Sequence, residues 1–216
     1  MTVLDVVNAT AASFLDCLAK ADHRTKPYDH WMLANALPER VCRAIANLPV
    51  APPADPTFDG RRESNNSTRF YFSPESQRTH AVCREVAEAF RSPAVVGALK
   101  AETKSPIDKG HLRIEYCQDV DGFWLEPHVD ISVKLFTMLI YLSDDPRLAD
   151  AGTDVYDASP EHKTVGTAPY AFNAGMIFIP GKDTWHGFTK RPIRGVRKSI
   201  IVNYVAPEWR AVEELA

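Results

Sequence analysis

The chain has few cysteines, and they form no pattern that binds metal or builds a disulfide scaffold. Only four occur in 216 residues, and none stands in a CxxC pair: Cys17, Cys42, Cys83 and Cys117. Wide spacing of this kind disfavours a zinc ribbon and a disulfide framework. The first three lie in segments with a helical pattern, where we expect them to pack as small apolar residues.

Long apolar runs and an excess of one charge are also missing. No stretch approaches the ~20 apolar residues that a membrane helix needs, and Met1–Asp5 lacks the cationic start of a signal peptide. The 25 basic and 28 acidic residues give a net charge of -3, which provides no field to attract nucleic acid or an anionic membrane. We therefore expect a cytoplasmic protein that binds neither nucleic acid nor membrane. The oligomeric state is left open.

The first part of the chain has mainly helical patterns. Apolar residues at helical spacing predict helices over 3–21, 38–48, 73–91 and 92–101, with a short strand at 68–72. No shift in composition separates this region from the rest. We therefore expect one domain, 1–216, in which residues 1–105 form a mainly helical support.

Short β segments follow one another after residue 106. About eight segments are rich in Val, Ile, Phe, Tyr and Thr and are separated by turn residues. They are His111–Tyr116, Phe123–Val129, Ser132–Leu142, Thr153–Tyr156, Ala168–Phe172, Met176–Ile179, Trp185–Thr189 and Arg197–Val205. Strands this short and closely spaced predict a mainly β fold, a cupin-like jelly roll over residues 106–207 with the helices packed outside.

Three side chains of the β region form a candidate metal site. His128 and Asp130 are two residues apart in a segment that reads as β, so both point to the same face. His186 follows an apolar strand and a turn, and we expect it to supply a third ligand. Two His and one carboxylate on one face of the metal, with the other positions open, are typical of non-heme Fe(II) oxygenases.

Arg197 and Ser199 form a candidate anion site. They share one face of the last β segment by the same spacing rule. A guanidinium inside a β-sandwich is costly unless an anion meets it, and the pair suits a buried carboxylate. The alternative, a solvated arginine at a strand edge, suits Arg194 better, because Arg194 stands beside Gly195 in a probable turn.

Taken in order, these motifs resemble those of the Fe(II)- and 2-oxoglutarate-dependent dioxygenases, most closely the prolyl-4-hydroxylase-like branch. The resemblance spans about Trp31 to Tyr204. It is carried by Arg113–Tyr116, Pro127–Asp130, Leu139–Asp145, Gly152–Thr153, Gly175–Pro180, Trp185–Gly187 and Arg197–Ser199.

The resemblance implies a double-stranded β-helix core and a set of cofactors. Fe(II) would be held by His128, Asp130 and His186, with 2-oxoglutarate chelating the metal and O2 as the second cosubstrate. The far carboxylate of 2-oxoglutarate would meet Arg197 and Ser199. It also implies that three further side chains lie beside 2-oxoglutarate, namely Tyr116, Tyr141 and Thr137.

We expect substrate contacts at the open end of the barrel, where loops carry specificity. Asn203 shares the face of Arg197 and Ser199, and Trp124, Asn65 and Arg69 lie in segments expected at that end.

The leading hypothesis is a hydroxylase of a small polar metabolite, such as an amino acid or a biosynthetic intermediate, that produces succinate and CO2. Two alternatives stay open. One is a prolyl-hydroxylase-like protein or peptide hydroxylase, because similarity within a fold is weak grounds for a substrate. The other is a non-oxygenase, cupin-like metal-binding module, which would have no need of Arg197 and Ser199.

Overall fold

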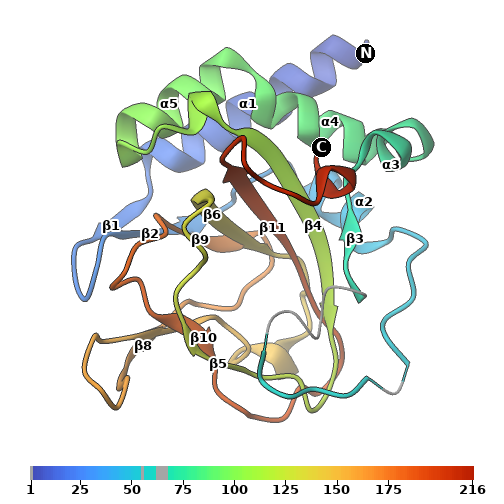
Figure 1. Ribbon diagram of the computed structural model, residues 1–216. Helices are drawn as coiled ribbons and strands as arrows, with labels where there is room; N and C mark the ends of the chain where they lie inside the picture. The colour runs from blue at the N-terminus through green and yellow to red at the C-terminus, as the bar shows by residue number, and fades with distance from the viewer. Residues whose placement is uncertain (1, 55, 62–67) are drawn as a thin grey trace.

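The structure is a computed structural model that describes residues 2–54, 56–61 and 68–216 (Figure 1). Its five α-helices lie in the first half of the described chain: α1 (Val3–Ala19), α2 (Glu39–Ala46), α3 (Pro74–Thr79), α4 (Ala81–Arg91) and α5 (Pro93–Thr103). Short 3-10 helices occur at Ile107–Lys109, Pro146–Leu148 and Val212–Glu214. No helix among the described residues is both long enough and apolar enough to span a bilayer.

Within the described residues, eleven strands form two antiparallel sheets. The strands are β1 (Asp22–Arg24), β2 (His30–Ala34), β3 (Phe70–Tyr71), β4 (His111–Asp119), β5 (Leu125–His128), β6 (Lys134–Tyr141), β7 (Asp154–Tyr156), β8 (Thr164–Thr167), β9 (Ala174–Phe178), β10 (His186–Phe188) and β11 (Arg197–Val205). The larger sheet has the order β1-β2-β9-β6-β11-β4-β3, and the smaller has the order β5-β10-β7-β8. The two sheets pack through a shared apolar cluster that includes Tyr141 and Phe178 from the larger and Val155 and Phe188 from the smaller.

The larger sheet has one face toward the helices and one toward the smaller sheet. Successive strand residues point to opposite faces, so odd-numbered and even-numbered residues of one strand lie in different surroundings. On β11, Ile200 and Val202 join the cluster under the helices, whereas Ser199 and Ile201 line a cavity between the sheets.

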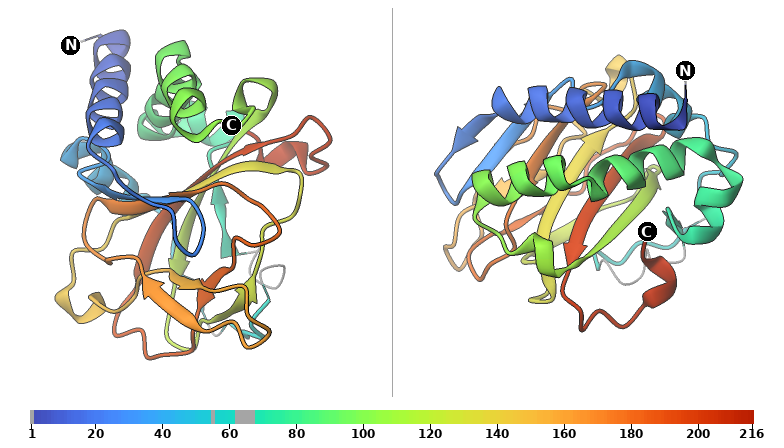
Figure 2. Two further views of the ribbon diagram at one scale, coloured as in Figure 1. Left: turned by 90° about the vertical axis from the view of Figure 1, so that its left-hand side faces the viewer. Right: turned by 90° about the horizontal axis from the view of Figure 1, so that it is seen from above.

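Helices α1, α4 and α5 cover the outer face of the larger sheet (Figures 1 and 2). Helix α1 begins with a capping box between Thr2 and Asp5, which satisfies backbone donors that a helix start leaves free. Phe14 of α1 meets Phe90 of α4 edge-on, with ring centroids 4.8 Å apart. These contacts leave the inner face of the sheet for the polar side chains described below.

The fold class predicted from the sequence is confirmed: the chain is mainly β, with helices packed outside a two-sheet core. Three details of the prediction are wrong. The helix expected over 73–91 is two helices that meet at His80. The strand expected at Ala168–Phe172 is instead β8, a few residues earlier, and β1 and β2 were missed. Strand β2 owes its place to pairing with β9, from which it is separated by at least 140 residues (Ala34 opposite Ala174), and β1 pairs only with β2, so neither strand leaves a strong local signal.

Gly175 sets how closely β9 and β6 approach. A Cβ atom there would lie 2.1 Å from the carbonyl oxygen of Leu139 on the neighbouring strand, a distance at which no side chain fits. Gly97, on an exposed turn of α5, has nothing within 4 Å of the corresponding point.

We therefore expect opposite effects from two Gly-to-Ala changes. Gly175→Ala forces the strands apart and should lower the free energy of unfolding by about 1–3 kcal/mol, the usual cost of overpacking. Gly97→Ala should raise it by about 0.5–1 kcal/mol, because glycine is a poor helix former. Urea denaturation of both variants checks this, and an unchanged midpoint for Gly175→Ala would contradict the close pairing.

Candidate metal centre

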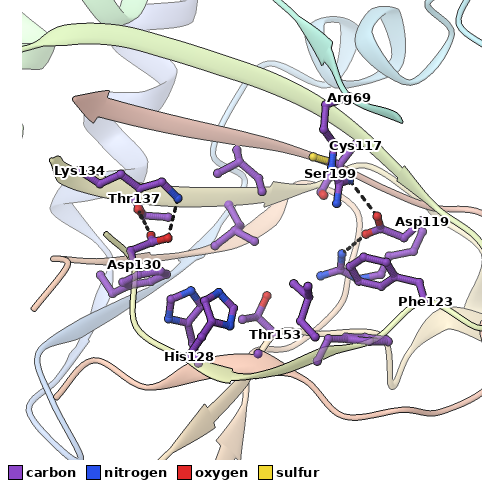
Figure 3. A pocket seen from close by; sticks show the side chains of 18 residues that line it. Arg69, Cys117, Asp119, Phe123, His128, Asp130, Lys134, Thr137, Thr153 and Ser199 are labelled. Carbon is purple, nitrogen blue, oxygen red and sulfur yellow. Dashed lines mark hydrogen bonds and ion pairs between the residues drawn. The ribbon is translucent and has the colours of Figure 1, made fainter. Parts of the chain in front are cut away.

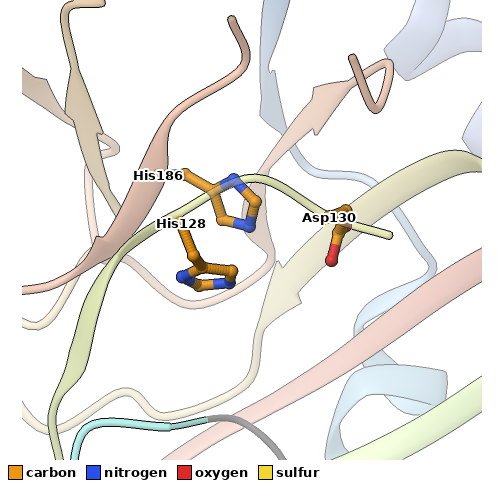
Figure 4. A group of neighbouring side chains, drawn as sticks. All are labelled: His128, Asp130 and His186. Atoms are coloured by element: carbon orange, nitrogen blue, oxygen red, sulfur yellow. The ribbon is translucent and has the colours of Figure 1, made fainter. Parts of the chain in front are cut away.

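The three side chains proposed as metal ligands converge at one point (Figure 4). Among the described residues, His128, Asp130 and His186 offer ligand atoms that all lie within 4.8 Å of one another. His128 ends β5, Asp130 follows it by two residues, and His186 begins β10. The ring centroids of the two imidazoles are 4.4 Å apart.

Backbone pairing brings the two histidines together. Strands β5 and β10 are antiparallel neighbours, with His186 opposite His128 in the register. Gly187 permits this approach, because a Cβ atom there would lie 2.9 Å from the carbonyl oxygens of both Leu125 and Glu126. Any larger residue after His186 would push β10 away from β5.

Both histidines are held in the form that binds a metal. The Nδ1 atom of His128 lies 2.8 Å from the Glu126 carbonyl oxygen, and that of His186 lies 2.9 Å from the Thr184 carbonyl oxygen. A carbonyl can only accept, so each Nδ1 carries the proton and each Nε2 presents a lone pair. Burial, and next the neighbouring His128, lower the pKa of His186 to about 3, so this imidazole stays neutral at physiological pH.

The carboxylate of Asp130 is oriented by two donors. Lys134 Nζ lies 2.5 Å from Oδ1, and Thr137 Oγ1 donates to Oδ2 at 2.7 Å. Each carboxylate oxygen carries two lone pairs, so these two hydrogen bonds orient the carboxylate without excluding a bond to a metal. The ammonium of Lys134 balances the charge of this buried carboxylate, which would otherwise be costly.

The donor set fits a divalent metal such as Fe(II). It combines two imidazoles and one carboxylate from a single side of the cavity, the facial arrangement that leaves further positions open. The backbone carbonyls behind the histidines and the two donors behind Asp130 fix the ligands in place before any metal arrives.

A second charged group lies at the other side of the same cavity (Figure 3). Asp119 of β4 accepts from Arg69 Nη1 at 2.8 Å and from Arg197 Nη1 at 2.6 Å. All three side chains are at most 6% exposed. Burial opposes the charge of Arg197, but the carboxylate of Asp119, together with the nearby Tyr141 and Tyr170, outweighs burial and raises the pKa of the guanidinium. Two guanidinium groups and one carboxylate leave one net positive charge.

Donors directed at an anion remain beside this group. Ser199 is fully buried, and its Oγ is the only buried side-chain nitrogen or oxygen without a hydrogen-bond partner among the residues that the structure describes. Arg197 donates from Nε to the Ala151 carbonyl and from Nη1 to Asp119, and its Nη2 has no partner in the described chain. A buried hydroxyl is normally satisfied, so a carboxylate at this end of the cavity fits both the net positive charge and the unpartnered Oγ of Ser199.

The other side chains expected beside the cosubstrate divide between the two faces of the sheet. Thr137 lines the cavity and holds Asp130. Tyr141 lies next to Arg197, whose guanidinium carbon is 5.7 Å from its ring centroid, and its hydroxyl donates to Thr153. The prediction for Tyr116 is wrong: this residue has even parity on β4, packs in the cluster under the helices and directs its hydroxyl at Ala46.

The expected substrate residues are placed differently from the prediction. Arg69 lines the cavity, but at its charged inner end and not at a loop tip. Asn203 does face inward, but it is fully buried and bonded to Arg113, Phe136 and Thr137. Trp124 packs over Gly60. It lines neither this cavity nor a second cavity that His128 also lines. Asn65 lies outside the described residues.

Two charged residues of the centre were missed in the sequence. Lys134 stands four residues after Asp130, and in the sequence it was noted only as part of the predicted strand Ser132–Leu142. Asp119 and Cys117 lie on the same face of β4, the face toward the cavity, whereas Tyr116 lies on the opposite face. The alternation of side chains along this strand is the signal that would have indicated Asp119 in place of Tyr116.

No family model matches the chain, and no curated protein matches it in sequence. Solved structures do match. A prolyl-4-hydroxylase from Pseudomonas putida aligns over 91% of this chain and 98% of its own, with a TM-score of 0.59 and 15% identity. A Trichoplax adhaerens prolyl hydroxylase, solved with a hypoxia inducible factor peptide, gives a TM-score of 0.57 at 13% identity, over 94% of this chain and 91% of its own.

A viral collagen prolyl hydroxylase from Paramecium bursaria Chlorella virus-1, solved as a 2-oxoglutarate complex, covers 82% of this chain and 94% of its own, with a TM-score of 0.53 and 16% identity. These likenesses show that the chain has the jelly-roll fold of the prolyl hydroxylases. At such low identity they show the fold alone.

The buried charge group predicts a large effect on stability. Asp119→Ala leaves two buried guanidinium groups without their carboxylate and should lower the free energy of unfolding by about 3–5 kcal/mol. Asp144→Ala is the control, since Asp144 pairs with Arg43 at the surface and such pairs contribute at most about 1 kcal/mol. Urea unfolding measures the free energy of unfolding of both variants. Equal losses would mean that the buried charge group contributes no more to stability than the surface pair.

Proposed function

We propose that the chain is an Fe(II)- and 2-oxoglutarate-dependent dioxygenase that hydroxylates a C–H bond of a small polar metabolite. The observation that carries the proposal is a single cavity with a facial His–Asp–His set at one side and the free donors of Ser199 and Arg197 at the other. A molecule that chelates a metal at one end and bears a carboxylate at the other matches both.

Fe(II), 2-oxoglutarate and O2 supply the oxidising chemistry, with succinate and CO2 as the coproducts. The protein positions the participants. His128, Asp130 and His186 would hold the metal, and the remaining coordination positions would face the cavity. Ser199 Oγ and Arg197 Nη2 would donate to the far carboxylate of 2-oxoglutarate, while Asp119 keeps the guanidinium of Arg197 in a fixed orientation.

Electrostatic balance supports this assignment. The net positive charge of Arg69, Asp119 and Arg197 is buried and is stabilised by an added anion. The pair of Asp130 and Lys134 is neutral before a metal binds. Apolar walls, such as Leu139 and Phe178, limit access of water around both ends and strengthen these interactions.

Of the two alternatives, one is favoured by a separate observation and the other is not. The structural neighbours include enzymes named for prolyl residues of peptides and collagen, which supports a peptide hydroxylase. A cupin-like metal-binding module would use the three ligands alone, and it gives no reason for an unpartnered hydroxyl at Ser199.

Metal and cosubstrate binding can be tested without a substrate. Under anaerobic conditions, Fe(II) together with 2-oxoglutarate should give a visible charge-transfer band that neither gives alone. His186→Ala should abolish metal binding and the band while leaving the far-UV circular dichroism spectrum unchanged. His111→Ala, an exposed histidine on β4, is the control and should behave as the wild type. Retention of the band in His186→Ala would remove His186 from the ligand set.

Absence of the band in the wild type, with the fold intact, would favour the metal-binding module.

The anion site predicts a separation of binding from stability. Ser199→Ala removes a hydroxyl that has no partner, so the free energy of unfolding should fall little. The same change should weaken 2-oxoglutarate binding about 2- to 12-fold, corresponding to a hydrogen bond of ~0.5–1.5 kcal/mol. Titration of the charge-transfer band at increasing 2-oxoglutarate measures the affinity.

Arg197→Ala should weaken the same binding more, about 10- to 150-fold, because its hydrogen bond is charged. The exposed Arg194 provides the matched control. Unchanged 2-oxoglutarate affinity in both Ser199→Ala and Arg197→Ala would place the anion elsewhere.

A further inference from the structure

Three polar side chains form a row across the inner face of the larger sheet. Asn203 of β11 lies opposite Arg113 of β4 on one side and opposite Thr137 of β6 on the other. None of the three is more than 3% exposed. Buried polar groups are costly unless each of them is hydrogen-bonded, so the bonds within this row decide what the row does.

The hydrogen bonds of Asn203 fix the orientation of its amide. Arg113 Nη1 lies 3.2 Å from Asn203 Oδ1, and a guanidinium can only donate. Asn203 Nδ2 lies 3.2 Å from the carbonyl oxygen of Phe136, which can only accept. The two contacts agree, so Oδ1 faces Arg113 and Nδ2 faces β6.

This orientation decides where the hydroxyl proton of Thr137 points. Asn203 Nδ2 donates to Thr137 Oγ1 at 2.9 Å. A hydroxyl has one proton of its own to donate, and the acceptor is Oδ2 of the metal ligand Asp130, at 2.7 Å (Figure 3). The bonds therefore run in one direction, from Arg113 through Asn203 and Thr137 to Asp130.

Arg113, at the start of the row, is held from several sides. Its Nε donates to Glu214 at 2.6 Å, and its Nη1 lies 3.1 Å from a carboxylate oxygen of Glu115. Its guanidinium carbon lies 4.9 Å from the ring centroid of Tyr71 and 5.0 Å from that of Trp209. With its first member held in this way, the row has a fixed direction.

The row also reaches the wall of a second cavity, here called the outer cavity, whose volume is about 360 Å³. Arg113 and Glu214 line the outer cavity. Three residues line both the outer and the inner cavity, namely His128, Asp130 and Lys134. The row therefore connects the wall of the outer cavity to a metal ligand that faces both cavities.

We propose, resting on the function proposed above, that Asn203 is a positioning residue of the metal centre. It acts through Thr137, whose hydroxyl it commits to donating to Asp130. Lys134 holds the other oxygen of this carboxylate at 2.5 Å, so donors on both oxygens keep the carboxylate in one orientation. Without the bond from Thr137, the carboxylate is free to turn toward the Lys134 ammonium, and the metal loses a fixed ligand.

Asn203→Asp tests the direction of the row, because it keeps the size of the side chain and replaces the donor by an acceptor. The proton of Thr137 can then be donated to the carboxylate at position 203 instead of to Asp130. We expect Co(II) to bind about 10- to 100-fold more weakly, the usual effect of losing a hydrogen-bond partner of a metal ligand. An added negative charge by itself would strengthen the binding of a cation, so the sign of the change separates the two explanations.

Thr137 variants test whether Asn203 acts through this hydroxyl. Thr137→Val should weaken Co(II) binding by a similar factor, whereas Thr137→Ser keeps a hydroxyl and should bind Co(II) as the wild type does. Asn203→Asp should have little further effect when combined with Thr137→Val, because both changes remove the same bond. Isothermal titration calorimetry measures the affinities. The visible d–d bands of bound Co(II) report the coordination geometry and should change in Asn203→Asp and Thr137→Val but not in Thr137→Ser.

Asn173→Asp and Thr103→Val are the matched controls. Both side chains are buried and hydrogen-bonded to backbone carbonyls, Asn173 to Leu37 and Thr103 to Leu99. Neither lines the inner or the outer cavity. Both changes should lower the free energy of unfolding in urea and leave the affinity for Co(II) and its d–d bands unchanged.

The inference is overturned if Asn203→Asp binds Co(II) as tightly as the wild type or more tightly, if its effect is the same with and without the Thr137 hydroxyl, or if the controls lose as much affinity. A wild type that binds no Co(II) would overturn both this inference and the proposed function. Binding of Co(II) without a charge-transfer band from Fe(II) and 2-oxoglutarate would count against the dioxygenase alone, and the affinities of the variants would still decide the role of Asn203.

Discussion

The close pairing of β10 with β5 is the contact on which the candidate centre depends. It places His186 opposite His128 and is possible because residue 187 has no side chain to collide with the carbonyls of β5. The same pairing presents the carbonyl oxygens that hold the two imidazoles in one tautomer. A local backbone constraint thus fixes both the position and the protonation of two ligands from segments 58 residues apart.

The inner face of the larger sheet carries charge that a β-sandwich core normally excludes. Each charge is met by another: Asp130 by Lys134, Asp119 by Arg69 and Arg197, and Arg113 by Glu115 and Glu214. Buried pairs of this kind add little net stability compared with apolar packing. Their retention over the whole inner face agrees with a role in holding ligands, and the unpartnered Ser199 marks where one of them fits.

The two cavities differ in their linings, which suggests that they bind different molecules. The inner one has fixed cations and suits an anionic cosubstrate, whereas the outer one has an apolar wall that includes Pro127, Ile131 and Trp209. Lys134, Asp130 and His128 belong to both, so the cosubstrate and the substrate would meet at the metal ligands. Two of the structural neighbours are named with a peptide or with collagen. In this chain, Trp209, Ala211 and Glu214 of the C-terminal stretch line the outer cavity.

The sequence by itself determined that His128 and Asp130 share a face, as do Arg197 and Ser199, and it indicated the fold class through its succession of short β segments, whereas the pairing of β10 with β5 brought His186 to the site. Two residues apart means one face, whatever the rest of the chain does. Partners were decided only by the tertiary structure. Asp119 accepts hydrogen bonds from both Arg69 and Arg197, which come from other parts of the chain. The side chain of Asn203 is hydrogen-bonded to Arg113 and Thr137, and Tyr116 lies on the face of the sheet that the helices cover. These contacts follow from the register between strands distant in sequence, which no local pattern records.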